Sequence, residues 1–225
     1  MSFIESARWP KALTGRVAQA APDARIHGYL VEDDLARHYS LAETVLLTLT
    51  GGLPDEPSLR AFEVAMCFLA PAPVAHGPSH CAVLAQTVGA PAKGVVATAA
   101  IALAEEAAHH AHAHESLLQW LEAPVGRPPE QYLTQDPSEA DRVRRLTHLL
   151  AEANCIVAGL AHPLSCDAAL VATLHRAGIR RHDQLQSALV LARLPCVLAE
   201  GFAARHGRLK DYPMTTPQFD HAFDP

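Results

Sequence analysis

The sequence lacks an excess of basic residues and has no apolar run long enough to cross a bilayer. Its formal net charge is -6 and its pI is near 6.1. A dedicated nucleic-acid binder needs clustered Lys and Arg for phosphate contacts, so this charge argues against that class. The longest apolar run, Gly94–Leu103, is too short to span a membrane and is soon followed by Glu105 and Glu106. We therefore expect neither nucleic acid nor a membrane as a partner.

The sequence also lacks closely spaced cysteines. Its five cysteines form no C-x-x-C pair, and most lie in apolar runs, where a free thiol behaves as a small hydrophobe. The first residues, MSFIESARWPKALTG, contain no apolar segment typical of a secretory leader. An odd number of cysteines without such a leader favours a reducing compartment, so we expect a cytoplasmic location.

What the sequence does contain is a set of helix signals. Hydrophobic residues make up 49% of the chain and charged residues 19%, enough for a sizeable core. Ser40 and Glu43 form an S-x-x-E capping box, and Gly51 ends the helix that follows. Only Arg25–Glu32 looks extended. The expected helices run over residues 40–51, 58–70, 78–88, 94–120 with a possible break near His109, 136–157, 167–177 and 182–205.

These signals predict a mainly α fold with one helical domain. We expect an N-terminal segment over residues 1–24, a single domain over residues 25–211 and a C-terminal arm over residues 212–225. The Ser79–Val88 helix and the Gly94–Leu103 run carry small and apolar residues around most of their surface. One chain can hardly cover such helices, so we expect a homodimer or a higher oligomer.

A cluster of histidines lies in the alanine-rich stretch AEEAAHHAHAHES. His110 and His114 are spaced i, i+4 on a helix, and two such side chains on one face can chelate a divalent metal. A third well-spaced ligand is missing, so a solvated, mildly pH-sensitive face is the favoured interpretation for His110, His112 and His114. A metal-binding helical protein remains an alternative.

Several segments, taken in order, resemble the citrate synthase family. RIHGYLVEDDLARHYSLAETVLLTLTGGLPDE is similar to the N-terminal segment of that family, and the HGP of APAPVAHGPSHCAVLAQTVGAPAKG is similar to its citryl-CoA lyase branch. GLAHPL resembles a G-x-G-H-P/R motif, SCDAALVATLHRAGI an N-V-D segment, and ALVLARLPCVLAEGF an arginine-bearing segment. The resemblance is collinear from about Arg25 to Tyr212 and implies a multi-helical citrate synthase-like large domain.

The resemblance also implies roles for six residues. Three would be catalytic and three would bind substrate: His109, His162 and Asp167 in the first group, and His76, Arg193 and, as a looser match, Arg208 in the second. In the family, the two chains of a dimer complete each other's sites.

The implied chemistry suits these residue types. Forming or cleaving a carbon–carbon bond next to a thioester needs a base, a donor to the enol oxygen and an acid for the partner carbonyl. Asp167 would be the base, His109 the enol donor and His162 the acid. Arg193 would hold a substrate carboxylate bidentately. The expected substrates are an acyl-CoA and a small keto acid, with no cofactor beyond the CoA thioester.

The sequence departs from the family pattern at three points. His110 and Ala111 replace two glycines that let the backbone approach a ligand, and Ala75 replaces an aspartate. Only four residues separate His162 from Asp167, so the small domain is expected to be reduced. These departures favour a second hypothesis, a non-catalytic partner subunit or small-carboxylate binder. In that case Asp167 would be a helix N-cap.

Overall fold

The computed structural model describes residues 13–208, 210 and 218–220. The chain divides into two compact units, residues 1–53 and 54–225. Most of the arm expected from residue 212 onward lies outside the described residues, and the domain boundaries expected from the sequence stay predictions.

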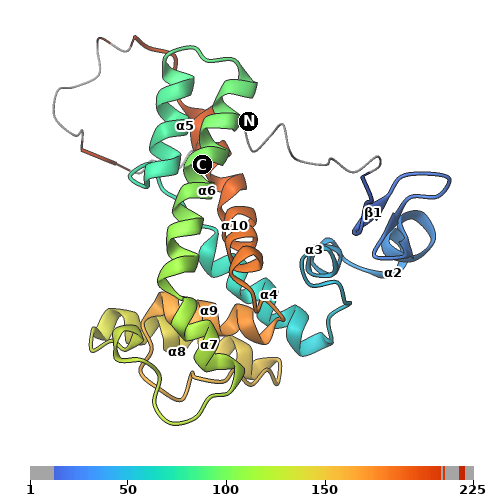
Figure 1. The fold of residues 1–225 in the computed structure, drawn as a ribbon. Coiled ribbons are helices and arrows are strands. Elements are labelled where there is room, and N and C mark those ends of the chain that lie inside the picture. The colour runs from blue at the N-terminus through green and yellow to red at the C-terminus, as the bar shows by residue number, and fades with distance from the viewer. Residues whose placement is uncertain (1–12, 209, 211–217, 221–225) are drawn as a thin grey trace, which may run out of the picture. The chain divides into compact units, whose positions relative to one another are not determined.

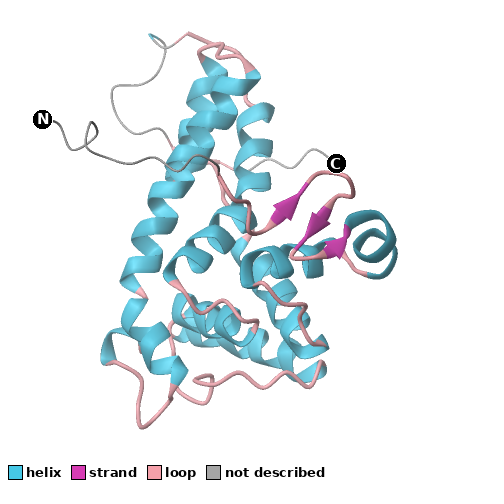
Figure 2. Cartoon of the chain, turned by 45° about the vertical axis from the view of Figure 1, so that its right-hand side comes forward, coloured by secondary structure: helices cyan, strands magenta, loops and turns pink. Residues whose placement is uncertain are grey.

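The first unit combines a small sheet with short helices. Strands β1 (Ala18–Gln19), β2 (Arg25–Ile26) and β3 (Tyr29–Leu30) pair antiparallel in the order β1-β2-β3 (Figure 2). The expected extended segment is confirmed as far as Leu30. A π-helical turn, Val31–Leu35, and the short α2, Ala36–His38, follow it.

The capping box predicted for the next helix, α3 (Leu41–Thr50), is confirmed. The backbone N–H of Glu43 donates to Ser40 Oγ at 3.2 Å, and the backbone N–H of Ser40 donates to Glu43 Oε2 at 2.7 Å. Gly51 ends the helix in the left-handed region, with φ of 83°. Both ends of α3 are therefore set by local sequence.

The second unit is helical, which confirms the mainly α fold. Its elements are α4 (Glu56–Leu69), α5 (Gly77–Thr87), α6 (Ala92–Ala113), α7 (Glu115–Glu122), a 3-10 turn at Glu130–Tyr132, α8 (Pro137–Glu152), α9 (Cys166–Arg176) and α10 (His182–Ala203). The break in the long alanine-rich helix falls at His114 and not near His109. Helix α8 ends at Glu152, five residues before the expected Val157.

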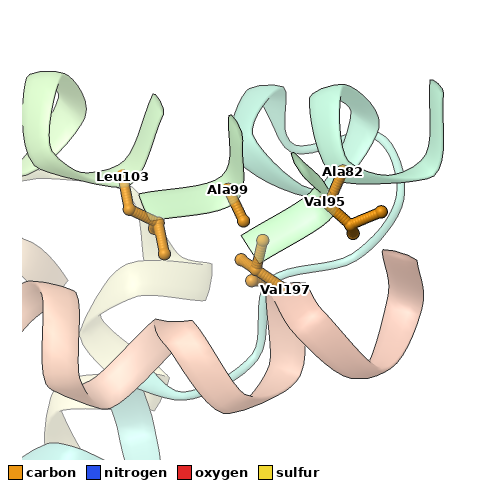
Figure 3. Close-up of a cluster of buried hydrophobic side chains, with 6 residues drawn as sticks. Ala82, Val95, Ala99, Leu103 and Val197 are labelled. Atoms are coloured by element: carbon orange, nitrogen blue, oxygen red, sulfur yellow. The ribbon is translucent and has the colours of Figure 1, made fainter. Parts of the chain in front are cut away.

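Helices α5, α6 and α10 pack together along their lengths (Figure 1). Their shared core includes Ala82 on α5, Val95, Ala99 and Leu103 on α6, and Val197 on α10 (Figure 3). The buried residues of α6 recur every fourth position and form one stripe along the helix: Val95, Ala99, Leu103, Ala107 and Ala111. The opposite side of α6 is therefore left uncovered within one chain.

Helix α9 is the centre of the other half of this unit. Nine of its eleven residues are buried, and it packs against α4, α7 and α8. Its first turn therefore projects from a well-packed element, which fixes the position of Asp167.

Helix α10 is long and apolar enough to cross a membrane by length and composition. It packs on α5 and α6 and holds Arg193 in an ion pair, as the core helix of a folded domain can. A single helix of this kind is weak evidence for a membrane span.

Candidate active site

The segment between α4 and α5 holds His76 at the start of α5. Ser79 Oγ donates to the carbonyl of Ala72 at 2.7 Å, and the backbone N–H of Ala72 lies 3.3 Å from Cys196 Sγ on α10. These contacts fasten the proline-rich segment to two helices. His76 then serves as the N-terminal flanking residue of α5 without capping it through its side chain.

Glu106 on α6 joins His76 to Arg193. Its Oε2 lies 2.7 Å from His76 Nε2, and its Oε1 is ion-paired with Arg193 Nη1. Arg193 Nε also donates to the carbonyl of Leu69, at 3.4 Å. The side chains of His76, Glu106 and Arg193 are 25%, 30% and 19% exposed, so this bridge is partly shielded from water and still accessible.

The bridge brings together two predicted substrate-binding residues, His76 and Arg193, through a residue that sequence reasoning missed. The only local signal for Glu106 was its position one helical turn before His110. From sequence alone, a glutamate in an alanine-rich helix is equally consistent with a solvent-exposed side chain. Its two partners lie far away in sequence.

One turn along α6, three aromatic rings form a stack. The ring centroids of His110 and His114 are 4.3 Å apart, and those of His114 and Tyr132 are 5.4 Å apart. His114 Nδ1 lies 2.9 Å from the carbonyl oxygen of His110, which requires a proton on that nitrogen. Tyr132 Oη donates to the carbonyl of Ala113 at 2.7 Å. The stack therefore satisfies backbone carbonyls at the C-terminal end of α6.

This stack corrects the expectation of a solvated histidine face. His114 is buried between the rings of His110 and Tyr132, and His110, which stacks on His114, is half-buried. His112 is exposed, as expected. Among the residues that the structure describes, no three His, Cys, Asp or Glu side chains are grouped to hold a metal ion.

The same turn brings α9 towards His110. The backbone N–H of Ser165 donates to the carbonyl of Tyr132 at 2.8 Å, directly before α9 begins. Ser165 Oγ caps α9 by accepting from the backbone N–H of Ala168, so the N-cap interpretation of Asp167 is wrong. Asp167 instead lies in the first turn of α9 with an exposed side chain.

The electrostatics of His110 show which charges lie near it. Burial, followed by the neighbouring imidazole of His114, lowers the pKa of His110 from 6.5 to about 4. The Asp167 carboxylate acts in the opposite direction, and Arg193 and His109 lower the pKa further. Two predicted site residues, Asp167 and Arg193, therefore lie within electrostatic reach of a neutral His110. His109 is exposed on the neighbouring face of α6.

The other two predicted residues lie elsewhere in this unit. The His162 ring contacts Trp120 edge-on, with centroids 6.0 Å apart. Arg208 is exposed and follows Gly207, whose N–H donates to the carbonyl of Thr87 at the end of α5. His76 lies at the other end of α5, roughly 16 Å from Thr87 by the helical rise. The catalytic and binding roles of all six residues stay predictions.

No protein-family model and no curated protein matches this sequence. Solved structures do resemble it. Citryl-CoA lyase from Hydrogenobacter thermophilus matches with a TM-score of 0.68 and 16% identity, over 96% of both chains. An ATP citrate lyase variant from Methanosaeta concilii, in complex with (3S)-citryl-CoA, matches with a TM-score of 0.56. ATP citrate lyase from Methanothrix soehngenii, with citrate and coenzyme A, matches with a TM-score of 0.55.

At such identities the likeness defines the fold. The two ATP citrate lyases are 12% identical to this chain, which aligns with 96% of its own length but only 43% of theirs. The chain therefore has a mainly α, citrate synthase-like fold. One structure that it matches over 96% of both chains is a citryl-CoA lyase, which confirms the resemblance inferred from the order of its motifs. The two chains are of similar length, so a reduced chain is compatible with this fold.

Proposed function

We propose that the chain is a citryl-CoA lyase-like enzyme that forms or cleaves a carbon–carbon bond between an acyl-CoA and a small keto acid. The observation that carries the proposal is that the charges of Asp167 and Arg193, two residues predicted from family motifs, both act on the ring of His110 in a citrate synthase-like fold. The Hydrogenobacter protein of similar length is a citryl-CoA lyase, so a short chain is no obstacle to this activity.

In the bond-forming direction, Asp167 takes a proton from the carbon next to the thioester carbonyl. The electron pair left behind is shared with the thioester oxygen, which becomes an enolate. A neutral imidazole has one N–H to donate to that oxygen. We assign this role to His110 and not to the exposed His109, because the His110 ring is half-buried against His114 and the charge of Asp167 acts on it.

The enolate carbon then attacks the keto carbon of the second substrate, and the keto oxygen gains a proton from an acid. We retain His162 for that role as the family resemblance implies. Run in reverse, the same steps cleave a citryl-CoA-like thioester into an acyl-CoA and a keto acid. Arg193 holds a carboxylate of the keto acid, because its planar fork suits two parallel hydrogen bonds.

The proposal includes a homodimer whose chains complete each other's sites. Ile101 and Val96 on the uncovered side of α6 are 67% and 39% exposed, and the alanines Ala97 and Ala104 beside them permit close helix packing. Gly207, next to Arg208, bonds to the end of α5 far from His76, so we assign Arg208 to the site of the partner chain.

A second candidate function is a non-catalytic partner subunit or small-carboxylate binder. Arg193 is already ion-paired with Glu106, and this observation favours that candidate. The release of acetyl-CoA and oxaloacetate from citryl-CoA by the purified wild-type chain tests the first proposal. If the chain also fails to bind oxaloacetate, citrate and acyl-CoA at millimolar concentrations, the partner-subunit candidate replaces the enzyme.

A further inference from the structure

Glu106 occupies a position that suits the carboxylate of a ligand. Its two oxygens contact two different donors, His76 Nε2 at 2.7 Å and Arg193 Nη1. These donors come from separate elements, the start of α5 and the middle of α10, and they converge on one carboxylate. A planar carboxylate held by a guanidinium and an imidazole is the arrangement expected of a bound carboxylic acid. Here the protein supplies that acid itself.

The bridge is only partly buried. Each of its three side chains is between 19% and 30% exposed, so its charged groups keep some contact with solvent. The Glu106 backbone lies on α6, which is fixed by the buried stripe of Leu103 and Ala107 on either side. Glu106 can therefore leave its partners only by rotating its side chain.

We propose that Glu106 is a specificity-determining residue, a built-in carboxylate that competes with anionic ligands for His76 and Arg193. A ligand carboxylate that enters this position must break both contacts of Glu106 and then lie beside a second negative charge. Charge-assisted hydrogen bonds are the strong ones, so the displacement lowers affinity substantially. This inference rests on the proposed function, since it places the ligand carboxylate at Arg193.

The test is calorimetric titration of citrate and oxaloacetate into the wild type and into Glu106→Gln. Glutamine keeps the size of the side chain and an acceptor oxygen, but it removes the competing charge. We expect Glu106→Gln to bind citrate about tenfold more tightly or better, the order of one charge-assisted hydrogen bond. Glu105→Gln is the matched control, because it removes the same charge from an exposed neighbouring position on α6. It should bind citrate as the wild type does.

Two further variants sharpen the result. Glu106→Asp keeps the charge but is shorter by one methylene, so it cannot bridge both donors and should give a smaller gain. Adding Arg193→Lys to Glu106→Gln should remove the gain, because lysine cannot replace the planar fork. If Glu106→Gln destabilises the fold, the aspartate variant still tests the competition. Equal or weaker citrate binding by Glu106→Gln and Glu106→Asp overturns the proposal.

These outcomes are separable from the proposed function. Tighter citrate binding in Glu106→Gln, with no cleavage of citryl-CoA by any variant, supports the competitor role and refutes the enzyme. Cleavage of citryl-CoA by the wild type, without tighter citrate binding in Glu106→Gln, supports the enzyme and refutes the competitor role.

Discussion

His110 illustrates how a residue's neighbours decide its role. Four histidines lie within the six residues 109–114 at the C-terminal end of α6, and sequence spacing alone could not separate them. The ring of His110 is half-buried against His114, which stacks in turn on Tyr132, whereas His112 remains in solvent. The half-buried ring of His110 is therefore neutral at neutral pH and keeps one N–H, which the proposed donor to an enolate needs.

The lowered pKa of His110 predicts a pH dependence of stability. The unfolded chain binds a proton at this residue below pH 6.5, while the folded chain resists protonation until about pH 4. The free energy of unfolding should therefore fall as the pH drops from 6.5 towards 4. The loss should be about 2 kcal/mol, below what the full shift would give because the ring is only half-buried.

Thermal unfolding between pH 7 and 4.5 measures this effect. His110→Gln should flatten the pH dependence of Tm, whereas His112→Gln, at an exposed position on the same helix, should leave it unchanged. His175, whose pKa burial also lowers, contributes in the same direction in every variant. An unchanged slope in His110→Gln would show that the ring is not shielded.

Local sequence predicted part of the fold, whereas contacts between residues distant in sequence determined the candidate site. Ser40 and Glu43 act within one helical turn, so their capping box could be read directly. Glu106 could not be found in that way, because its partners lie 30 residues before it and 87 residues after it. The family motifs supplied His76 and Arg193, but nothing in those motifs pointed to the carboxylate between them.

At the scale of the element, some helix ends were set by local residues and others by contacts distant in sequence. Asp136, the first residue of the helix expected over 136–157, caps α8 by accepting from the backbone N–H of Ser138 at 2.8 Å. The break between α6 and α7 carries no glycine or proline signal. The break falls at His114. There Tyr132 Oη donates a hydrogen bond to the carbonyl of Ala113, and His114 Nδ1 donates one to the carbonyl of His110. One of these partners lies 19 residues away, beyond the reach of local reasoning.

The packing of α10 on α5 and α6 depends on Gly201. A Cβ atom at this position would lie 2.9 Å from the Cβ of Ala82 and 3.2 Å from Val95 Cγ1. Gly201→Ala should therefore destabilise the fold by about 1–3 kcal/mol, despite the better helix propensity of alanine. Gly94→Ala is the control within α6, since its Cβ would meet only ordinary contacts at 3.4 Å or more. Urea denaturation of both variants should show a loss only for Gly201→Ala.

At the scale of the whole molecule, the uncovered side of α6 is the feature that one chain does not explain. Its exposed Ile101 lies on the same helix as the carboxylate bridge and the histidine stack, so an interface there would place two sites near one another. We expect light scattering at micromolar concentration to give a dimer or larger species, because burying such apolar surface is favourable.

Ile101→Asp should shift that species towards the monomer, since a buried charge without a partner is strongly unfavourable. Val125→Asp, at an 83% exposed position in the loop after α7, should not. A monodisperse wild-type monomer would contradict the interface and leave Arg208 without a site to complete.

The rate of citryl-CoA cleavage, compared across site variants, tests the central claim most directly. The wild type should release acetyl-CoA and oxaloacetate. Asp167→Asn and His110→Gln should each lose roughly a hundredfold or more of that rate, the usual contribution of a positioned acid or base. His109→Gln should stay within a few-fold of the wild type. No cleavage by the wild type, or a loss confined to His109→Gln, would contradict the account.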